Sequence, residues 1–408
     1  MDKKRRVVFA LHFERSQVRK VLPGLLGFAR KSGWEVHCEN TRDIRFLRER
    51  QKALEHWGAE GLIVSPLTPV NVKELREWGM PVVGIWGDAA SASAAGIPVV
   101  QDGDWDIGRL AARHLWERGY RHFSGMGVTA VPWSTQRLAG FAAYLREQGI
   151  EDVALFRLPH TNLSTKHWAK WHPRTRDWLQ RLPKPVGLFA ASDWLGQNAL
   201  ELCVENGLSV PYQVAVVGVD DDVALCELLR PTLTSIRLDL AATGYRAAKL
   251  LAAAMDGQRP IPAEIVVVPP VGVIPRQSTD SVAVSDPVMA RVLRLITENA
   301  ERPFNVTDIL RAIPISRRTL ERKTIKVLGH SPLDEIHRIK TERAKDLLAH
   351  TDLTDKEIAA RLGLNGPKHL RRVFHKTIGV LPSAYRRDAA SRSAMDSISV
   401  PHGDRPDR

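Results

Sequence analysis

Cysteine is scarce in this chain of 408 residues. Only Cys38, Cys203 and Cys226 occur, far apart, with neither a CxxC pair nor the Cys/His spacing of a metal site. This pattern excludes a disulfide framework and the common zinc-binding motifs. We expect three buried apolar thiols in a reducing cytoplasm, with no metal and no cofactor.

Long apolar runs are also missing. The basic start MDKKRRVVFALHF resembles the start of a signal peptide. Its apolar stretch Val7–Leu11 is too short for the apolar region of such a peptide, and His12, Glu14 and Arg15 follow at once. No segment approaches the roughly 20 apolar residues of a membrane-spanning helix. The start therefore predicts a first β-strand, and we expect no membrane partner.

Several enzyme motifs are absent as well. The segment ALHFERSQV, which ends the first predicted strand, has no glycine where a dinucleotide-binding GxGxxG would stand. Walker, HExxH and GxSxG sequences do not occur. These absences argue against the corresponding oxidoreductases, nucleotidases, metalloproteases and hydrolases, and we predict that the protein is not an enzyme.

Positive charge is abundant and uneven. The net charge is +13 and the pI is near 9.8. The segment 285–388 alone contains 21 Lys and Arg residues against 13 Asp and Glu residues. An anionic partner of this segment is the simplest explanation.

Strands and helices alternate regularly from Arg5 to Val268. The predicted strands are RVVFAL, EVHCE, GLIVS, PVVGIW, GIPVVQD, HFSGMG, VALFRL, VGLFAA, VAVVGVD, LTSIRL and IVVVPPVGVI. The clearest helices are Val18–Lys31, Ile107–Arg118, Gln136–Gln148, Leu195–Asn206 and Ala241–Met255. Short apolar strands alternating with helices predict an α/β fold with parallel sheets covered on both faces. The number of units suits two doubly wound lobes.

Composition changes mark the domain limits. We predict a two-lobed ligand-sensing domain over residues 1–278 and a linker over 279–287, within the unpatterned segment PRQSTDSVAVSDP. An all-helical domain is predicted over 288–388. The tail 389–408, rich in Ser, Asp, Arg and Pro, is expected to be disordered.

The all-helical domain contains two helix-turn-helix patterns, Val306–Leu328 and Thr354–Ile378, joined by an amphipathic helix over Leu333–Ala349. In the first pattern Thr307 and Ser316 are the expected helix caps, and in the second pattern Thr354 is. The connecting helix, about 25 Å long at 1.5 Å per residue, could hold two recognition helices about one DNA turn apart. The second helix of each pattern is basic, so we predict binding in the major groove of double-stranded DNA.

The candidate DNA contacts are polar or basic residues of these second helices and of the turn before the later one. They are Ser316, Arg317, Arg318, Thr319, Arg322, Lys323, Asn365, Lys368, His369, Arg371 and Arg372. Arg and Lys can contact guanine edges or phosphates, and an amide can contact adenine. A solvated helix face is the alternative for a single basic run, but two capped basic helices in tandem make it less probable.

These residues also carry a resemblance. The matching positions are Leu320-Glu321-Arg322, Gly329-His330-Ser331-Pro332, Arg343-Ala344, Leu347-Leu348, Glu357-Ile358-Ala359, Gly363, Leu370, Val373-Phe374-His375-Lys376, Gly379, Pro382 and Tyr385-Arg386. With them, segment 288–388 resembles the DNA-binding domain of the AraC/XylS family of transcription regulators. The chain departs from the family pattern at Pro314, Thr324 and Leu364–Pro367.

The region before it resembles another family. The residues concerned are Asp102, Gly108, Ala111-Ala112, Leu115, Arg118-Gly119-Tyr120-Arg121, Arg137, Gly140-Phe141, Ala191-Ser192-Asp193, Val217-Gly218-Val219-Asp220-Asp221 and Leu233-Thr234-Ser235-Ile236. They are similar to the periplasmic-binding-protein-like core of LacI-type repressors. That similarity implies a cleft between two lobes in which a small ligand binds.

Candidate ligand contacts follow from the strand ends. Asp102, Asp193 and Asp220 lie at or just after predicted strands, and Arg137 opens the helix after HFSGMG. Ligands of parallel sheets bind at such ends, and carboxylates with arginine suit sugar hydroxyls. The candidate stacking platforms are aromatic, namely Phe13, Trp86, Trp133 and Trp194. Helix capping is the alternative for each carboxylate, core packing is the alternative for each aromatic, and Asp221–Asp222 are expected to cap or face solvent.

The fusion of both regions resembles the bacterial xylose operon regulators, the XylR-like family. This resemblance implies a cytoplasmic homodimer that binds a small sugar, with xylose as the first expectation. It also implies activation of catabolic genes through promoter DNA and RNA polymerase. The alternative is a sugar-processing or sugar-binding protein of the same α/β class in which DNA binding is secondary.

Overall fold

The computed structural model describes residues 4–40, 45–159, 165–257, 265–280, 284 and 286–388. The chain divides into two units, Met1–Ala283 and Val284–Arg408. The first unit is α/β and the second is helical, so the predicted fold class is confirmed. The tail that the sequence predicts to be disordered lies outside the described residues.

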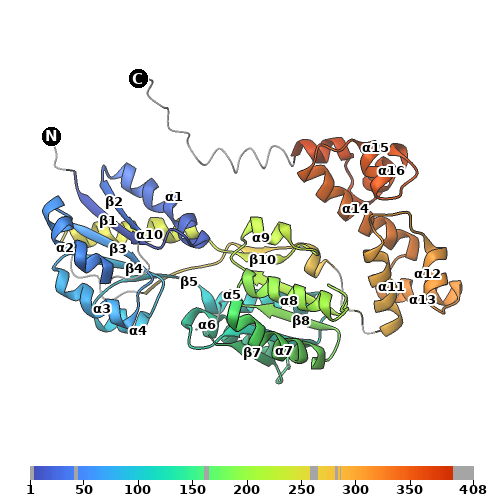
Figure 1. Cartoon of the computed structure of the whole chain (residues 1–408), viewed down its shortest axis with the longest axis horizontal. Coiled ribbons are helices and arrows are strands. Elements are labelled where there is room, and N and C mark those ends of the chain that lie inside the picture. The colour runs from blue at the N-terminus through green and yellow to red at the C-terminus, as the bar shows by residue number, and fades with distance from the viewer. Residues whose placement is uncertain are drawn as a thin grey trace. The chain divides into compact units, whose positions relative to one another are not determined.

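The first unit contains two separate six-stranded sheets, each the centre of one lobe (Figure 1). The first sheet has the order β11-β5-β4-β3-β1-β2, and its strands are parallel. They are β1 (Arg6–Leu11), β2 (Glu35–Asn40), β3 (Gly61–Ser65), β4 (Val82–Ile85), β5 (Val99–Asp102) and β11 (Ile265–Val268). The central β3 is buried along its whole length, as expected for a strand covered on both faces.

The second sheet has the order β12-β10-β9-β8-β6-β7, and only β12 runs antiparallel to its neighbour. Its strands are β6 (His122–Val128), β7 (Ala154–Leu158), β8 (Val186–Ala190), β9 (Val214–Val219), β10 (Thr234–Arg237) and β12 (Gly272–Ile274). β8 and β9 are entirely buried, which makes them the core of this lobe.

Helices cover both sheets (Figure 1). Those of the first lobe are α1 (Ser16–Lys31), α2 (Arg45–Trp57), α3 (Pro69–Leu75), α4 (Ala89–Ala94) and α10 (Leu240–Met255). Those of the second lobe are α5 (Asp104–Glu117), α6 (Pro132–Glu147), α7 (Thr165–Arg181), α8 (Asp193–Glu205) and α9 (Val223–Leu228). The described part of the unit also contains the 3-10 turns η1 (Arg76–Trp78) and η3 (Gln277–Thr279).

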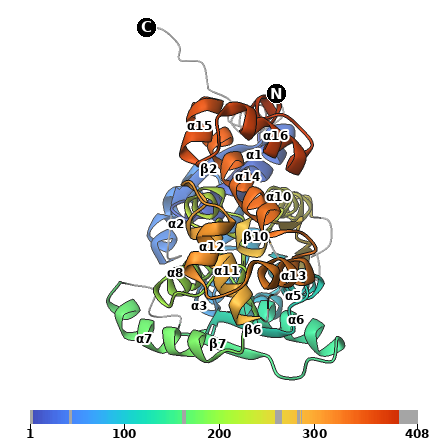
Figure 2. The same cartoon turned by 90° about the vertical axis from the view of Figure 1, so that its right-hand side faces the viewer.

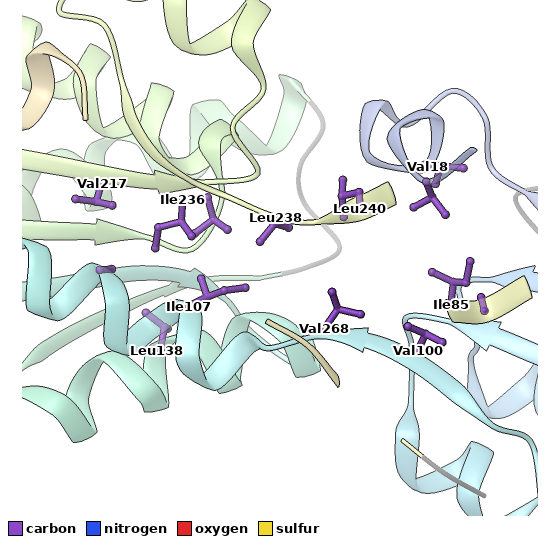
Figure 3. Packing of buried hydrophobic residues seen from close by; sticks show 14 of the residues in the cluster. Val18, Ile85, Val100, Ile107, Leu138, Val217, Ile236, Leu238, Leu240 and Val268 are labelled. Carbon is purple, nitrogen blue, oxygen red and sulfur yellow. The ribbon is translucent and has the colours of Figure 1, made fainter. Parts of the chain in front are cut away.

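The chain crosses between the lobes three times, after β5, after β10 and after β11. Buried apolar residues line these crossings: Leu238 and Leu240 lie on the second and Val268 on the third (Figure 3). They belong to one hydrophobic cluster that continues into both lobes. The lobes are therefore joined by a packed hinge, and the strand ends beside it can form a shared site.

Three details of the first unit correct the sequence expectations. The run IVVVPPVGVI forms two strands in different sheets, since Pro269 and Pro270 cannot continue a ladder. The helix predicted from Gln136 begins at Pro132, because proline suits the first helical position. Cys38 is exposed on the edge strand β2, whereas the other two cysteines are buried as expected.

The second unit consists of α11 (Pro287–Glu298), α12 (Val306–Ala312), α13 (Arg317–Leu328), α14 (Pro332–His350), α15 (Asp355–Arg361) and α16 (Pro367–Ile378). Within this unit α14 lies between the group α11–α13 and the pair α15–α16 (Figures 1 and 2). Ser316 and Thr354 cap α13 and α15 as expected. The cap of α12 is Asn305 rather than Thr307, because Asn305 and Asp308 form a reciprocal capping box.

The segment that the sequence assigns to the linker makes defined contacts near both of its ends. Thr279 is buried and its hydroxyl lies 2.9 Å from His114 Nε2. Asp286 caps α11 through the backbone N–H groups of Val288 and Met289. The second unit thus has its own helix before the first helix-turn-helix pattern.

Candidate functional site

Arg137 is the centre of a buried charged cluster at the strand ends of both lobes. Its Nε donates to Asp104 Oδ1 at 2.8 Å, and its Nη1 donates to the Ala191 carbonyl oxygen at 2.8 Å and lies 3.7 Å from Asp220 Oδ1. Asp102, at the end of β5, also interacts electrostatically with Arg137. One guanidinium therefore faces three carboxylates.

Glycines bring this cluster together. A Cβ on Gly108 of α5 would lie 1.9 Å from the Arg137 carbonyl oxygen. A Cβ on Gly140 of α6 would lie 2.1 Å from the Trp105 carbonyl oxygen. The two helices can thus touch backbone to backbone, which places Arg137 on α6 beside Asp104 at the start of α5.

The cluster holds more negative than positive charge in a place with little water. Burial raises the pKa of Asp102 to about 7, although Arg137 opposes the rise. Burial also raises the pKa of Asp104 and of Asp220, again against Arg137. Additional hydrogen-bond donors would stabilise the ionised form of these carboxyl groups, and a ligand with hydroxyl groups would supply such donors.

Two tryptophans adjoin the charged groups. Trp86 Nε1 donates to Asp102 Oδ2 at 2.9 Å, and Thr243 Oγ1 lies 3.4 Å from Asp102 Oδ1. The Arg137 guanidinium lies over the Trp133 ring, 5.0 Å from its centroid. Both rings are partly buried, so the site combines fixed polar groups with aromatic surface, as small-ligand sites commonly do.

The backbone is unusual at the same strand ends. Among the described residues, four that are not glycine have positive φ angles: Trp86 at 56°, Ala130 at 59°, Asp220 at 110° and Asp221 at 44°. They follow β4, β6 and β9. Side chains rarely adopt this conformation, and such strain clusters at ligand sites whose groups are held in fixed positions.

The first lobe reaches across to the turn after β9 through α1. Gln17 Nε2 donates to Asp220 Oδ2 at 3.2 Å. Lys20 Nζ donates to the Asp221 carbonyl oxygen at 2.9 Å. Side chains of the first lobe thus contact the turn of the second lobe that carries Asp220.

The remaining predicted ligand residues are less central. Asp193 is 1% exposed and its carboxylate accepts hydrogen bonds from Ser235 Oγ at 2.5 Å and from the Asp222 backbone N–H at 2.8 Å. Trp194 is exposed, and Phe13 packs against the hydrophobic cluster of the hinge. The structure thus brings Asp102, Arg137, Asp220, Trp86 and Trp133 together, whereas Asp193 mainly supports the turn after β9.

Sequence reasoning missed several residues of the site. Gln17 and Lys20 lie on α1 and carry no strand-end signal, whereas Asp104 begins α5 two residues after β5, a position that could have identified it. Ser65, at the end of β3, is a further buried polar group of the first lobe that was not predicted, and its hydroxyl has no hydrogen-bond partner. Its position at a strand end was the one signal that could have identified it.

The expectation that Asp221 caps a helix or faces solvent is wrong. Asp221 is 3% exposed and its two carboxylate oxygens pair with Arg237 Nε at 2.7 Å and Arg276 Nη2 at 2.8 Å. Arg276 also donates to Glu227 at 2.5 Å and directly precedes η3. The turn that carries Asp220 is therefore tied to the last part of the first unit.

The raised pKa of Asp102 has a measurable consequence. A carboxyl group whose pKa rises on folding, here from 3.8 to about 7, binds its proton more tightly in the folded state. Its contribution to the free energy of unfolding is therefore lost as pH rises from about 4 to about 7. We expect the ligand-free first unit to melt at lower temperature at pH 8 than at pH 5, and Asp102→Asn to reduce that difference.

Thermal unfolding of the full chain checks this, with Asp106→Asn as control. Asp106 is exposed in the first turn of the same α5. An unchanged pH dependence in Asp102→Asn would contradict the assignment.

A second candidate surface lies on α13. Ser316, Arg317, Arg318 and Arg322 are exposed, whereas Thr319 and Lys323 are half-buried. Arg317 pairs with Glu321 on the same helix at 3.1 Å. Lys323 is bound internally to Asp286, the cap of α11, and this contact lowers the pKa of the Asp286 carboxyl.

The corresponding surface on α16 is similar in charge. Asn365, Lys368, Arg371 and Arg372 are exposed, and Arg371 Nε lies 2.8 Å from Asp355 Oδ2. His369 is half-buried. Its Nδ1 accepts from the Asn365 backbone N–H at 3.2 Å and its ring lies 5.7 Å from that of His337. The exposed cations of α13 and α16 fit the phosphate and base contacts of a recognition helix.

Among the residues that the structure describes, no group of His, Cys, Asp and Glu could hold a metal ion. In the same part of the chain no helix is long and apolar enough to cross a membrane.

The fold and these two surfaces define a two-part transcription regulator. A periplasmic binding protein-like domain matches residues 112–279, and a helix-turn-helix domain matches residues 309–388. The first match contains Arg137, Trp133 and Asp220 of the buried cluster, whereas Asp102 and Asp104 lie just before it, and the second match contains the two basic helices.

Known proteins share this arrangement over nearly the whole chain. The xylose operon regulatory protein of Escherichia coli strain K12 is 27% identical over 390 residues, 94% of this chain and 97% of the relative. That of Haemophilus influenzae is 26% identical over 385 residues, 92% and 97% of the two chains. The solved structure of the xylose-binding transcription activator XylR matches with a TM-score of 0.77 and 26% identity, covering 95% of this chain and 99% of that one. The chain is a DNA-binding transcription regulator that is similar to these proteins over nearly its whole length.

Proposed function

We propose that this protein is a transcription activator controlled by a small sugar that binds between the lobes, with D-xylose the first candidate. The observation that carries the proposal is the Arg137 cluster, in which one guanidinium faces three buried carboxylates beside two tryptophans. The names of the E. coli and H. influenzae relatives, and of the XylR structure, support xylose.

The chemistry suits a polyol. Ionised carboxylates accept paired O–H donors from neighbouring sugar hydroxyls, and the guanidinium donates to sugar oxygens. Trp86 and Trp133 offer aromatic faces to the C–H surface of a sugar ring. A sugar that satisfies these groups in both lobes would favour the closed state, since a ligand shifts an equilibrium toward the state that it binds better.

We further propose that the protein acts as a cytoplasmic homodimer on promoter DNA and recruits RNA polymerase. Two copies would present four recognition helices to a pair of half-sites. Sedimentation of the purified chain with and without DNA tests the dimer, and sugar-dependent transcription with purified polymerase tests activation.

A thermal-shift panel tests the sugar. We expect D-xylose to raise the melting temperature of the first unit in a concentration-dependent manner, because only the folded state binds it. L-arabinose, D-ribose, D-glucose and D-xylonate serve as comparisons. No shift with any pentose would contradict pentose control, while a shift with another sugar alone would reassign the effector.

The two recognition helices are tested by Arg322→Ala and Arg371→Ala. Each is expected to weaken specific DNA binding by about 1–3 kcal/mol, or 5- to 150-fold, if it contacts a guanine. A phosphate contact would instead lower affinity for all sequences and reduce the salt dependence. Arg311→Ala is the matched control, because Arg311 is an exposed arginine of α12, outside both recognition helices. Full affinity with unchanged salt dependence in both variants would remove the recognition-helix assignment.

A further inference from the structure

Lys340 is a buried lysine in the middle of α14, the helix that joins the two helix-turn-helix patterns. It is 2% exposed, and its ammonium donates to the carbonyl oxygens of Arg302, at 2.9 Å, and of Leu362. Burial lowers its pKa to about 8. Among the described residues no carboxylate pairs with it. Burying an ammonium without a counter-ion is costly, so its two carbonyl contacts require an explanation beyond packing.

The two carbonyl groups belong to different halves of the unit. Arg302 lies in the turn before α12, in the first helix-turn-helix half, whereas Leu362 ends α15 in the second half. Both carbonyls lie outside regular helix hydrogen bonding, and the lysine satisfies one acceptor on each side. A single side chain of the joining helix therefore fastens both halves to α14.

The same two turns also touch each other directly. A Cβ on Gly363, whose φ is 59°, would lie 2.1 Å from the Pro303 backbone nitrogen. Next to this contact, Arg361 Nε pairs with Glu301 Oε2 at 3.1 Å. The halves thus form a continuous contact, which we name the inter-half clamp: residues 301–303, Lys340 and residues 361–363.

We propose that Lys340 is a positioning residue that fixes the separation and relative angle of the recognition helices α13 and α16. The inference rests on the proposed DNA-binding role of these two helices. Two recognition helices on one rigid frame must enter grooves one helical turn apart, about 34–36 Å. Without the clamp the halves would be joined through α14 and its immediate packing alone, and their spacing could vary. The clamp therefore makes the protein selective for the distance between two half-elements, in addition to their sequence.

Lys340→Met tests this in the full chain, since methionine is unbranched and apolar but cannot donate to either carbonyl. DNA is first selected in vitro with the wild type, and duplexes are then made with one or two base pairs added or removed between the half-elements. We expect the wild type to lose at least tenfold in affinity on the altered duplexes. Lys340→Met should bind the parent duplex several-fold more weakly, and its spacing penalty should fall to within about threefold.

The control is Lys345→Met, a lysine of the same helix that pairs with Glu342 near the surface. It should keep the wild-type spacing penalty. Lys340→Gln provides a milder variant if methionine prevents folding, because an amide can satisfy one carbonyl but not span both. A folded Lys340→Met or Lys340→Gln protein with the full wild-type spacing penalty would overturn the inference.

A measurement without DNA separates this inference from the proposed function. Spin labels at Arg318→Cys and Lys368→Cys, in a Cys38→Ser background that removes the exposed thiol, report the distance between α13 and α16. The wild-type background should give one narrow distance distribution and the Lys340→Met background a broad one. Equal widths would overturn the positioning role of Lys340. Failure of the wild type to select any DNA would instead remove the DNA-binding role, whatever the distances show.

Discussion

Arg137→Ala is expected to abolish the stabilisation that D-xylose gives to the protein. Arg137 is the one cation at the centre of the cluster and donates to Asp104 while lying 3.7 Å from Asp220. Its removal leaves buried carboxylates without their partner, a loss of about 3–5 kcal/mol in comparable cases. The sugar also loses its guanidinium donor, so affinity should fall by two orders of magnitude or more.

The variant should also change its response to pH. Without Arg137, only the hydrogen bond from Trp86 still opposes the effect of burial on the pKa of Asp102, so the carboxyl group should bind its proton still more tightly. The free energy of unfolding of Arg137→Ala should therefore go on falling above pH 7, where the contribution of this group in the wild type levels off. Calorimetry with and without D-xylose at pH 5 and 8 measures both effects.

The control for Arg137→Ala is Arg109→Ala. Arg109 pairs with Glu147 at the surface between the same two helices, and its loss should leave sugar binding unchanged. Retention of a wild-type D-xylose shift by Arg137→Ala would contradict the site. Simultaneous loss of sugar response and of DNA binding would indicate misfolding, which circular dichroism of the variant would reveal.

The charged centre of the site was accessible to sequence reasoning because strand ends can be read from hydrophobic runs. Asp102, Asp220 and Arg137 were predicted in this way, and the structure places them together. Gln17 and Lys20 were not predicted, because they lie on α1 and reach the site only through tertiary packing. Asp104 was not predicted either, although it begins α5 two residues after β5. The close crossing of α5 and α6 at Gly108 places Arg137 beside Asp104, and sequence spacing does not encode such a crossing.

The same limit applies to the DNA-binding unit. The two basic helices and the caps Ser316 and Thr354 follow from local patterns, and the structure confirms both caps. The internal partners of Lys323 and His369 depend on α11 and α14, which pack from elsewhere in the chain. The local pattern therefore predicts which helix is basic. Whether a given basic side chain is free to contact DNA depends on neighbours that the local pattern does not reveal.

Arg276→Ala is expected to uncouple sugar binding from DNA binding. Lys20 of the first lobe donates hydrogen bonds to the carbonyl oxygens of Asp220 and Asp221, in the turn after β9. The Asp221 carboxylate also holds Arg276, just before η3 and a few residues before the chain enters the second unit. Lobe closure can thus move Arg276 through a single turn. Coupling between sites is typically worth about 1–3 kcal/mol, or 5- to 150-fold in affinity, and we expect it to fall below about twofold.

The substitution leaves Asp221 paired with Arg237, so no unpaired buried carboxylate remains. Arg276→Ala should therefore bind D-xylose within about threefold of the wild type and should bind selected DNA normally without sugar. Arg237→Ala is the matched control, because Arg237 pairs with the same carboxylate but is 47% exposed and lies on β10, away from the exit to the second unit. It should keep the coupling. DNA affinity measured by fluorescence anisotropy across a D-xylose titration gives the coupling directly. Full coupling in Arg276→Ala would show that the signal leaves the first unit by another route, since a ligand shifts DNA affinity only through contacts that differ between its two states.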